Sequence, residues 1–164
     1  GKRYGANFDA STRLGYLGVP NALFTLGLSL QDSQVTDPFL GTHRRLRRNG
    51  RSFGRANFRH DITAYNFSYG FSYYNSARDG SGLTQIDIND TETNIGEFGL
   101  NFFAEKQAFN GITFRFDVQN ANSQIRCRER IRYVGATAAG IVEEIEDSCN
   151  GTGIKYALKI RQTF

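Results

Sequence analysis

An arginine-rich segment carries side chains that could bind an anion. It runs from His43 to Arg51, and its candidate contact residues are Arg44, Arg45, Arg47 and Arg48. Because a guanidinium group pairs with phosphate or carboxylate through two parallel hydrogen bonds, they could bind anionic substrates or the phosphates of lipopolysaccharide. The alternative is a solvated loop without a ligand. Nucleic-acid binding is disfavoured, since the net charge is only +4 and there is a single basic cluster.

Catalytic and metal-binding motifs are missing from the sequence. It contains no Gly-x-Ser-x-Gly, no His-Glu-x-x-His and no phosphate-binding loop with Gly-Lys-Ser/Thr. Two thiols are too few for a zinc site, and His43 and His60 lie far from them in the sequence. The acidic runs 87–90 and 143–147 lack the spaced ligands and the glycine of a calcium loop. We therefore expect neither an enzyme nor a cofactor or metal.

Seven segments alternate apolar and polar side chains. They cover about residues 3–16, 21–35, 51–61, 64–76, 94–105, 111–119 and 152–164. The sixth can extend as a ribbon to about Tyr133. Because successive side chains of a strand point to opposite faces, each segment predicts a strand with one apolar and one polar face.

Charged residues are confined to one face of these segments. The apolar stripes contain none, whereas the opposite faces hold twelve: Arg3, Asp9, Arg13, Arg55, Arg59, Glu97, Glu105, Arg115, Asp117, Lys155, Lys159 and Arg161. A charge near the middle of a bilayer costs roughly 2–4 kcal/mol for Arg or Lys, so this partition is expected of strands that meet lipid. No apolar run is long enough for a transmembrane helix. The pattern predicts an all-β fold, an antiparallel transmembrane β-barrel.

The connections between the segments alternate in length. Short and long ones follow each other at 17–20, 36–50, 61–63, 77–93, 106–110 and 134–151. Bacterial barrels alternate short periplasmic turns with long outer loops in this way. Seven strands would leave two unpaired edges, which lipid does not tolerate, and the chain lacks an initiator Met. We therefore expect residues 1–164 to be the C-terminal part of a larger barrel.

The last long connection carries two further features. Cys127 and Cys149 flank it, and in this topology both lie in an outer hairpin, where an oxidising environment favours a disulfide. The acidic run 143–147 lies opposite the arginines of 126–132, so we expect charge pairing between the arms of the hairpin. A disulfide and complementary charges would both restrain this hairpin.

Three stretches resemble the C-terminal barrel region of TonB-dependent outer-membrane receptors. Residues 111–120 are similar to the penultimate strand of that family, which ends on Val-x-Asn, and the Arg-rich stretch 126–135 follows them. Residues 30–38 resemble an upgoing strand and its loop, and Phe164 matches the terminal aromatic residue that the barrel-assembly machinery reads. The resemblance covers essentially the whole chain.

The resemblance implies a fold, a function and partners. These receptors are barrels of about 22 strands with an N-terminal plug and a TonB box, so residues 1–164 would be the last strands, without the plug. The implied function is uptake of a siderophore, cobalamin, sugar or peptide across the Gram-negative outer membrane. Implied partners are outer-membrane lipid, lipopolysaccharide, the remaining barrel and plug, TonB through that plug, and the barrel-assembly machinery. The implied assembly signal is Tyr156, Leu158, Ile160 and Phe164.

The inward charges and the overall architecture leave alternatives open. Glu97, Glu105, Arg115 and Asp117 could form an acid–base pair, but a salt-bridge ladder that holds wall and plug in register is the favoured interpretation. A small stand-alone barrel with a structural or adhesive role would need an eighth strand from 77–93 or 121–133. A soluble β-sandwich binding module would place the aromatic stripes against another sheet.

Overall fold

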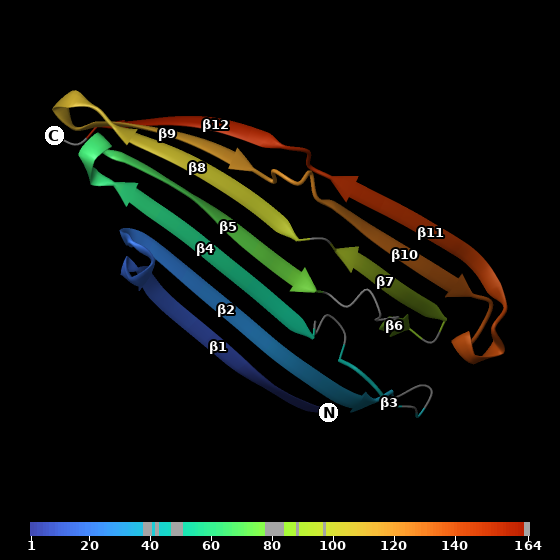
Figure 1. The fold of residues 1–164 in the computed structure, drawn as a ribbon. Coiled ribbons are helices and arrows are strands. Elements are labelled where there is room, and N and C mark those ends of the chain that lie inside the picture. Colours follow the sequence, from blue (N-terminus) through green and yellow to red (C-terminus); the bar gives the residue numbers. More distant parts are fainter. Residues whose placement is uncertain are drawn as a thin grey trace.

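Two antiparallel sheets account for the fold in the computed structural model of the chain. The structure describes residues 1–37, 41, 43–46, 51–77, 84–87, 89–96 and 98–162. Their secondary structure is almost entirely strand, with short 3-10 turns between some of the strands (Figure 1). The predicted all-β, antiparallel architecture is therefore confirmed. Within these residues, none of the helical turns is long and apolar enough to cross a bilayer.

The larger sheet, here called the wall, contains the seven predicted strands. Its neighbours follow the chain in the order β1 (Lys2–Leu14), β2 (Val19–Thr36), β4 (Ser52–Ile62), β5 (Phe67–Ala77), β8 (Gly99–Gln107), β9 (Ile112–Gln119) and β12 (Lys155–Gln162). The short β3 (His43–Arg44) pairs with the far end of β2. Each wall strand is antiparallel to the next. The alternation of side chains therefore located these strands correctly.

Three short connections join wall strands at one end of the sheet (Figure 1). They are the 3-10 turns η1 (Gly15–Leu17), η2 (Thr63–Tyr65) and η3 (Phe109–Gly111). The chain reverses through residues with positive φ, namely Gly18 at 79° and Asn66 at 46°. Glycine and asparagine tolerate this left-handed conformation better than other residues do. Local sequence therefore fixes the tight turns that the length pattern predicts.

A second sheet, here called the outer sheet, corrects two of the predicted loops. It contains β6 (Thr84–Asp87), β7 (Asp90–Gly96), β10 (Ile125–Tyr133) and β11 (Val142–Gly151), in the order β11-β10-β7-β6, with the turn η4 (Thr137–Ala139) between β10 and β11. The connections 77–93 and 134–151 thus contain strands, and the segment 94–105 is divided between β7 and β8. These strands carry polar side chains on both faces, so apolar alternation did not reveal them.

The outer sheet continues the wall rather than stacking on it. Strands β7, β10 and β11 lie roughly in line with β8, β9 and β12, beyond the ends of those strands (Figure 1). The predicted ribbon from Gly111 to Tyr133 exists in this form, but it breaks between Gln119 and Ile125. Wall and outer sheet are therefore two segments of the same rising strands.

Asparagine side chains hold the link between β9 and β10 to β8 at this break. Asn120 has a φ of 54°, and its backbone N–H donates to Asn101 Oδ1 at 2.9 Å. Asn122 Oδ1 accepts from the backbone N–H of Leu100 at 3.1 Å. Asn120 Oδ1 accepts from the backbone N–H of Gln124 at 3.0 Å. Side-chain amides here supplement a backbone hydrogen bond, from the Ala121 N–H to Leu100 O at 2.7 Å.

The apolar face of the wall is continuous and largely uncovered. Aromatic rings meet across neighbouring strands, with centroids 5.7 Å apart for Phe58 and Phe71 and 6.5 Å for Phe71 and Phe102. Leu158 of β12 is nevertheless 67% exposed. Among the described residues, Ala22 is the only buried hydrophobic side chain. The wall is therefore a single layer without a protein core, and the second sheet expected of a β-sandwich does not cover it within these residues.

Candidate functional site

The polar face of the wall is hollowed and forms the candidate site. The hollow has a volume of about 920 Å³ and is lined mainly by β4, β5, β8, β9 and β12, with the ends of β10 and β11 above them. Hydrogen-bonded polar side chains cross its floor. Asn57 Nδ2 donates to Thr25 Oγ1 at 3.1 Å, and Asn101 Nδ2 donates to Ser72 Oγ at 3.2 Å. These contacts follow from the register, which places each pair on directly opposite residues.

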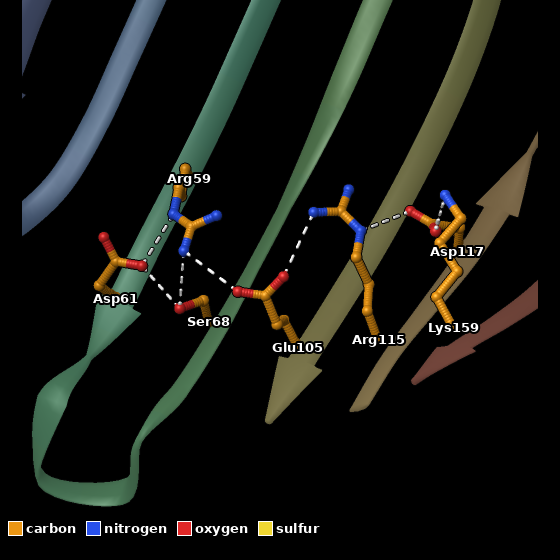
Figure 2. Close-up of polar contacts among 7 residues, drawn as sticks. All are labelled: Arg59, Asp61, Ser68, Glu105, Arg115, Asp117 and Lys159. Carbon is orange, nitrogen blue, oxygen red and sulfur yellow. Dashed lines mark hydrogen bonds and ion pairs between the residues drawn. The ribbon is translucent and has the colours of Figure 1, made fainter. Parts of the chain in front are cut away.

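A chain of ion pairs crosses the same face near the short turns (Figure 2). On β4, Arg59 Nε lies 2.8 Å from Asp61 Oδ1, and Ser68 Oγ of β5 donates to the same carboxylate at 2.6 Å. The Glu105 carboxylate of β8 lies 3.5 Å from both Arg59 Nη2 and Arg115 Nη1. These side-chain contacts thus link β4, β5, β8 and β9.

The ion-pair chain ends on the last strand of the wall. Arg115 Nε of β9 donates to Asp117 Oδ1 at 2.9 Å, and Lys159 Nζ of β12 lies 2.9 Å from Asp117 Oδ2. The side chain of Asp117 is 8% exposed, so its charge needs these partners. Charge is balanced along the chain, with three cations facing three carboxylates. Glu105, Arg115 and Asp117 therefore pair with one another within the wall, as the predicted ladder requires. Its second part, contact with a plug, stays a prediction, and Glu97 lies outside the described residues.

Phe103 lies between the two arginines of this chain. Its ring centroid is 4.3 Å from the guanidinium carbon of Arg115 and 5.6 Å from that of Arg59, so both contacts are cation–π interactions. Gly70 makes room for the ring, because a Cβ there would lie 2.7 Å from Phe103 and 2.0 Å from the carbonyl oxygen of Phe58. The glycine and the aromatic ring are therefore a matched pair on neighbouring strands.

Arginine side chains form a row on β10 in the outer sheet. Arg126, Arg128, Arg130 and Arg132 share one face, because they are two residues apart. Arg128 pairs with Glu146 of β11, and Arg132 pairs with Glu144 at 2.7 Å, which confirms the predicted charge pairing between the arms of the hairpin. Arg130 pairs with Asp90 of β7. Hydrogen bonding from Arg130 to Asp90 raises the pKa of the arginine above its ordinary value.

A disulfide joins β10 to β11. Cys127 and Cys149 are directly opposite in the register, and their sulfur atoms are 2.08 Å apart. Both cysteines lie on the face of β10 and β11 opposite the arginine row. Covalent and ionic links therefore restrain the hairpin from its two sides.

The arginines predicted for anion binding are engaged within the chain where they are described. Arg44 Nε lies 2.6 Å from Asp37 Oδ2, and Arg45 Nε lies 2.8 Å from Asp32 Oδ1. These pairs fasten β3 and the residues after it to the end of β2. Arg47 and Arg48 lie outside the described residues.

The residues of the predicted assembly signal lie on the last wall strand. Tyr156, Leu158 and Ile160 occupy the apolar face of β12 and are between 64% and 68% exposed. Phe164 lies outside the described residues.

Sequence reasoning missed the partners that complete the ion-pair chain. Ser68 and Phe103 received no role, although the Ser68 hydroxyl contacts charges of β4 and the Phe103 ring contacts arginines of β4 and β9. A usable signal existed in the pairs Arg59–Asp61 and Arg115–Asp117, because residues two apart on a strand share a face.

Comparison with known proteins gives no relative: no family model, no curated protein and no solved structure matches the chain. In the part of the chain that the structure describes, no group of three or more His, Cys, Asp or Glu side chains could hold a metal ion. The functional interpretation therefore depends on the geometry of the two faces.

Proposed function

We propose that residues 1–164 form part of the wall of an outer-membrane transporter of the TonB-dependent receptor type. The observation that carries this proposal is the contrast between the two faces of a single-layer sheet. One face is apolar and uncovered, and the other carries hydrogen-bonded polar groups and balanced charges. Water around the apolar face would be unfavourable, since exposed apolar patches of this extent are rare on soluble monomers. Hydrocarbon is the environment that matches this face.

Aromatic residues at the short turns support this placement. Each of the three 3-10 turns carries an exposed aromatic side chain: Tyr16 is 73% exposed, Tyr65 69% and Phe109 77%. Aromatic side chains concentrate where a barrel wall meets the interface between hydrocarbon and water. The three turns would then mark the periplasmic interface, and the outer sheet would stand outside the cell.

The height of the apolar face is compatible with a bilayer. On β2 the outward residues run from Ala22 to Leu30. Eight rises of about 3.4 Å give about 27 Å along the strand, or about 20 Å along the membrane normal at the tilt of about 40° usual in barrels. Interfacial rings such as Tyr16 extend this distance at the periplasmic end. The total approaches the apolar band of about 25 Å that outer-membrane barrels present.

The two edges of the wall support a larger barrel over a stand-alone one. Among the described strands, β1 pairs only with β2, and β12 pairs only with β9. Unpaired backbone groups at such edges are costly in lipid, so further strands should bind there. The segments that could have supplied an eighth wall strand, 77–93 and 121–133, instead contribute β6, β7 and β10 to the outer sheet.

In the proposed transporter the two faces have separate tasks. The apolar face holds the wall in the bilayer, and the polar face lines the passage and meets the plug. The outer sheet then contributes to solute capture, and a plug on the remainder of the protein couples release to TonB. A siderophore, cobalamin, a sugar or a peptide remains the class of cargo implied by the resemblance.

Membrane fractionation and gel mobility test the proposal. The intact protein that contains residues 1–164 is expressed with an outer-membrane signal sequence. We expect it in the outer-membrane fraction, soluble only in detergent, and migrating faster on gels before boiling than after. Deletion of tonB should then abolish energy-dependent solute uptake while leaving the gel mobility unchanged. A protein that remains soluble without detergent would overturn the proposal.

A further inference from the structure

Two cations stand apart from the ion pairs of the hollow, at the level where the outer sheet meets the wall. Arg126 of β10 and Lys155 of β12 both line the hollow. Within the described residues, neither side chain has an ion-pair or hydrogen-bond partner. The other cations that line the hollow are Arg59, Arg115 and Lys159, and each pairs with a carboxylate. Among the described residues that line the hollow, the unpaired positive charges therefore lie only at this end.

Neutral polar residues line the same hollow as these two cations, namely Asn120, Gln124, Asn150 and Thr152. Asn150 lies opposite Arg126 in the pairing of β10 with β11, and Thr152 lies between Asn150 and Lys155 along the chain. Thr152 Oγ1 and Gly153 O both accept from the side-chain amide of Asn120, at 3.2 and 2.8 Å. The link between β11 and β12 is thereby held to the residue that follows β9, so the backbone that precedes Lys155 is restrained.

Tyr74 closes the floor beneath them. Its ring lies over Gly99, where a Cβ would come within 2.1 Å of the ring, and its hydroxyl donates to Gln124 Oε1 at 3.5 Å. Gln124 itself is 7% exposed. The floor is thus a polar, ordered surface that offers hydroxyl and amide groups next to unpaired positive charge.

We propose that this end of the hollow binds a small solute with two anionic groups, carboxylates or phosphates, through Arg126 and Lys155. A volume of about 920 Å³ accommodates a solute of that size. Guanidinium and ammonium groups both form charge-assisted hydrogen bonds to such oxygens, and the guanidinium can do so through two parallel bonds. The inference rests on the proposed function, since it places the site in the passage of the transporter.

Calorimetric titration of the intact protein in detergent tests the site, with inorganic pyrophosphate and succinate as separate probes. Arg126→Gln and Lys155→Gln should each weaken binding of the preferred probe by about tenfold, the effect of one lost charge-assisted hydrogen bond. Arg161→Gln is the matched control, because Arg161 lies on the polar face of β12 but does not line the hollow. Arg161→Gln should change the dissociation constant less than about twofold, because salt screens the interaction between the exposed Arg161 charge and an anion bound in the hollow.

The outcomes separate this inference from the proposed function. Stronger binding of pyrophosphate or of succinate identifies the phosphate or the carboxylate as the preferred group. If neither probe binds, or if Arg161→Gln weakens binding as much as Lys155→Gln, the anion site is wrong. Heat-modifiable gel mobility of every variant shows that the barrel has folded. A protein with that mobility but without binding overturns only the site, whereas a protein soluble without detergent overturns the transporter itself.

Discussion

Substitution of Leu26 tests directly whether the apolar face of the wall contacts hydrocarbon. It lies midway between Ala22 and Leu30 on β2, and its neighbours across the sheet are Ala10 and Ala56. Because these neighbours are small and Leu26 is already 39% exposed, Leu26→Arg removes little packing within the protein. If hydrocarbon surrounds the side chain, the arginine should lower the free energy of unfolding by roughly 2–4 kcal/mol. The ratio of folded to unfolded protein would fall by about 30-fold to about 700-fold.

Equilibrium urea unfolding of the intact protein in lipid vesicles measures this change, with the heat-modifiable gel band as the readout. Leu26→Ala separates lost apolar contact from added charge, and if the side chain lies in hydrocarbon it should cost roughly 2 kcal/mol, since three carbon groups worth about 0.8 kcal/mol each are lost. Thr25→Arg places the same charge at the same depth on the polar face, where we expect a cost below about 1 kcal/mol. Equal costs for the two arginine variants would refute the assignment of the apolar face to lipid.

Three further perturbations test the wall and the outer sheet. Gly70→Ala should destabilise the protein by about 1–3 kcal/mol through overpacking, whereas Gly54→Ala, where nothing lies within 4 Å of the added Cβ, should be neutral in the same urea titration. Glu105→Gln removes the carboxylate shared by two arginines, and thermal unfolding should show a loss of about 1 kcal/mol, because the pairs are partly solvated; an unchanged midpoint would argue against a structural role. Replacing both Cys127 and Cys149 with serine should speed amide hydrogen exchange in the outer sheet, because the disulfide stabilises the closed loop by about 3 kcal/mol. Exchange in the wall should stay slow.

The wall could be predicted from the sequence because a single physical requirement acts on every second residue. A charge such as Arg55 or Arg59 is tolerated on one face and excluded from the other, so the alternation shows which residues share a face. Boundaries followed the same pattern, and β2 and β4 lie within a few residues of their expected limits. The tight turns were found because their lengths alternate with those of the long connections.

The outer sheet could not be predicted in the same way. Strand β10 has arginines on one face, and on the other it combines Cys127, Glu129 and Ile131, so neither face is uniformly apolar. Strand β11 was interpreted as an acidic loop for the same reason. Only its charge complementarity to β10 was visible in the sequence.

The sequence also did not predict that Arg126 and Lys155 line one hollow. The residues that line this end of the hollow are set by the break after Gln119, where the outer sheet meets the wall. Arg126 and Lys155 line the same hollow because β10 and β12 belong to different sheets that meet at that break. Periodicity within one strand contains no information about that meeting.

The asparagine junction has a consequence for how this architecture can diversify. Asn101, Asn120 and Asn122 hold the link between β9 and β10 to β8 at the level where the wall ends and the outer sheet begins. We therefore expect that the outer sheet can be exchanged as a unit while the strands of the wall keep their alignment. On the proposed function, grafting a different outer sheet onto the strand ends at Gly99, Gln119 and Lys155 would change solute capture and leave the membrane anchor unaltered.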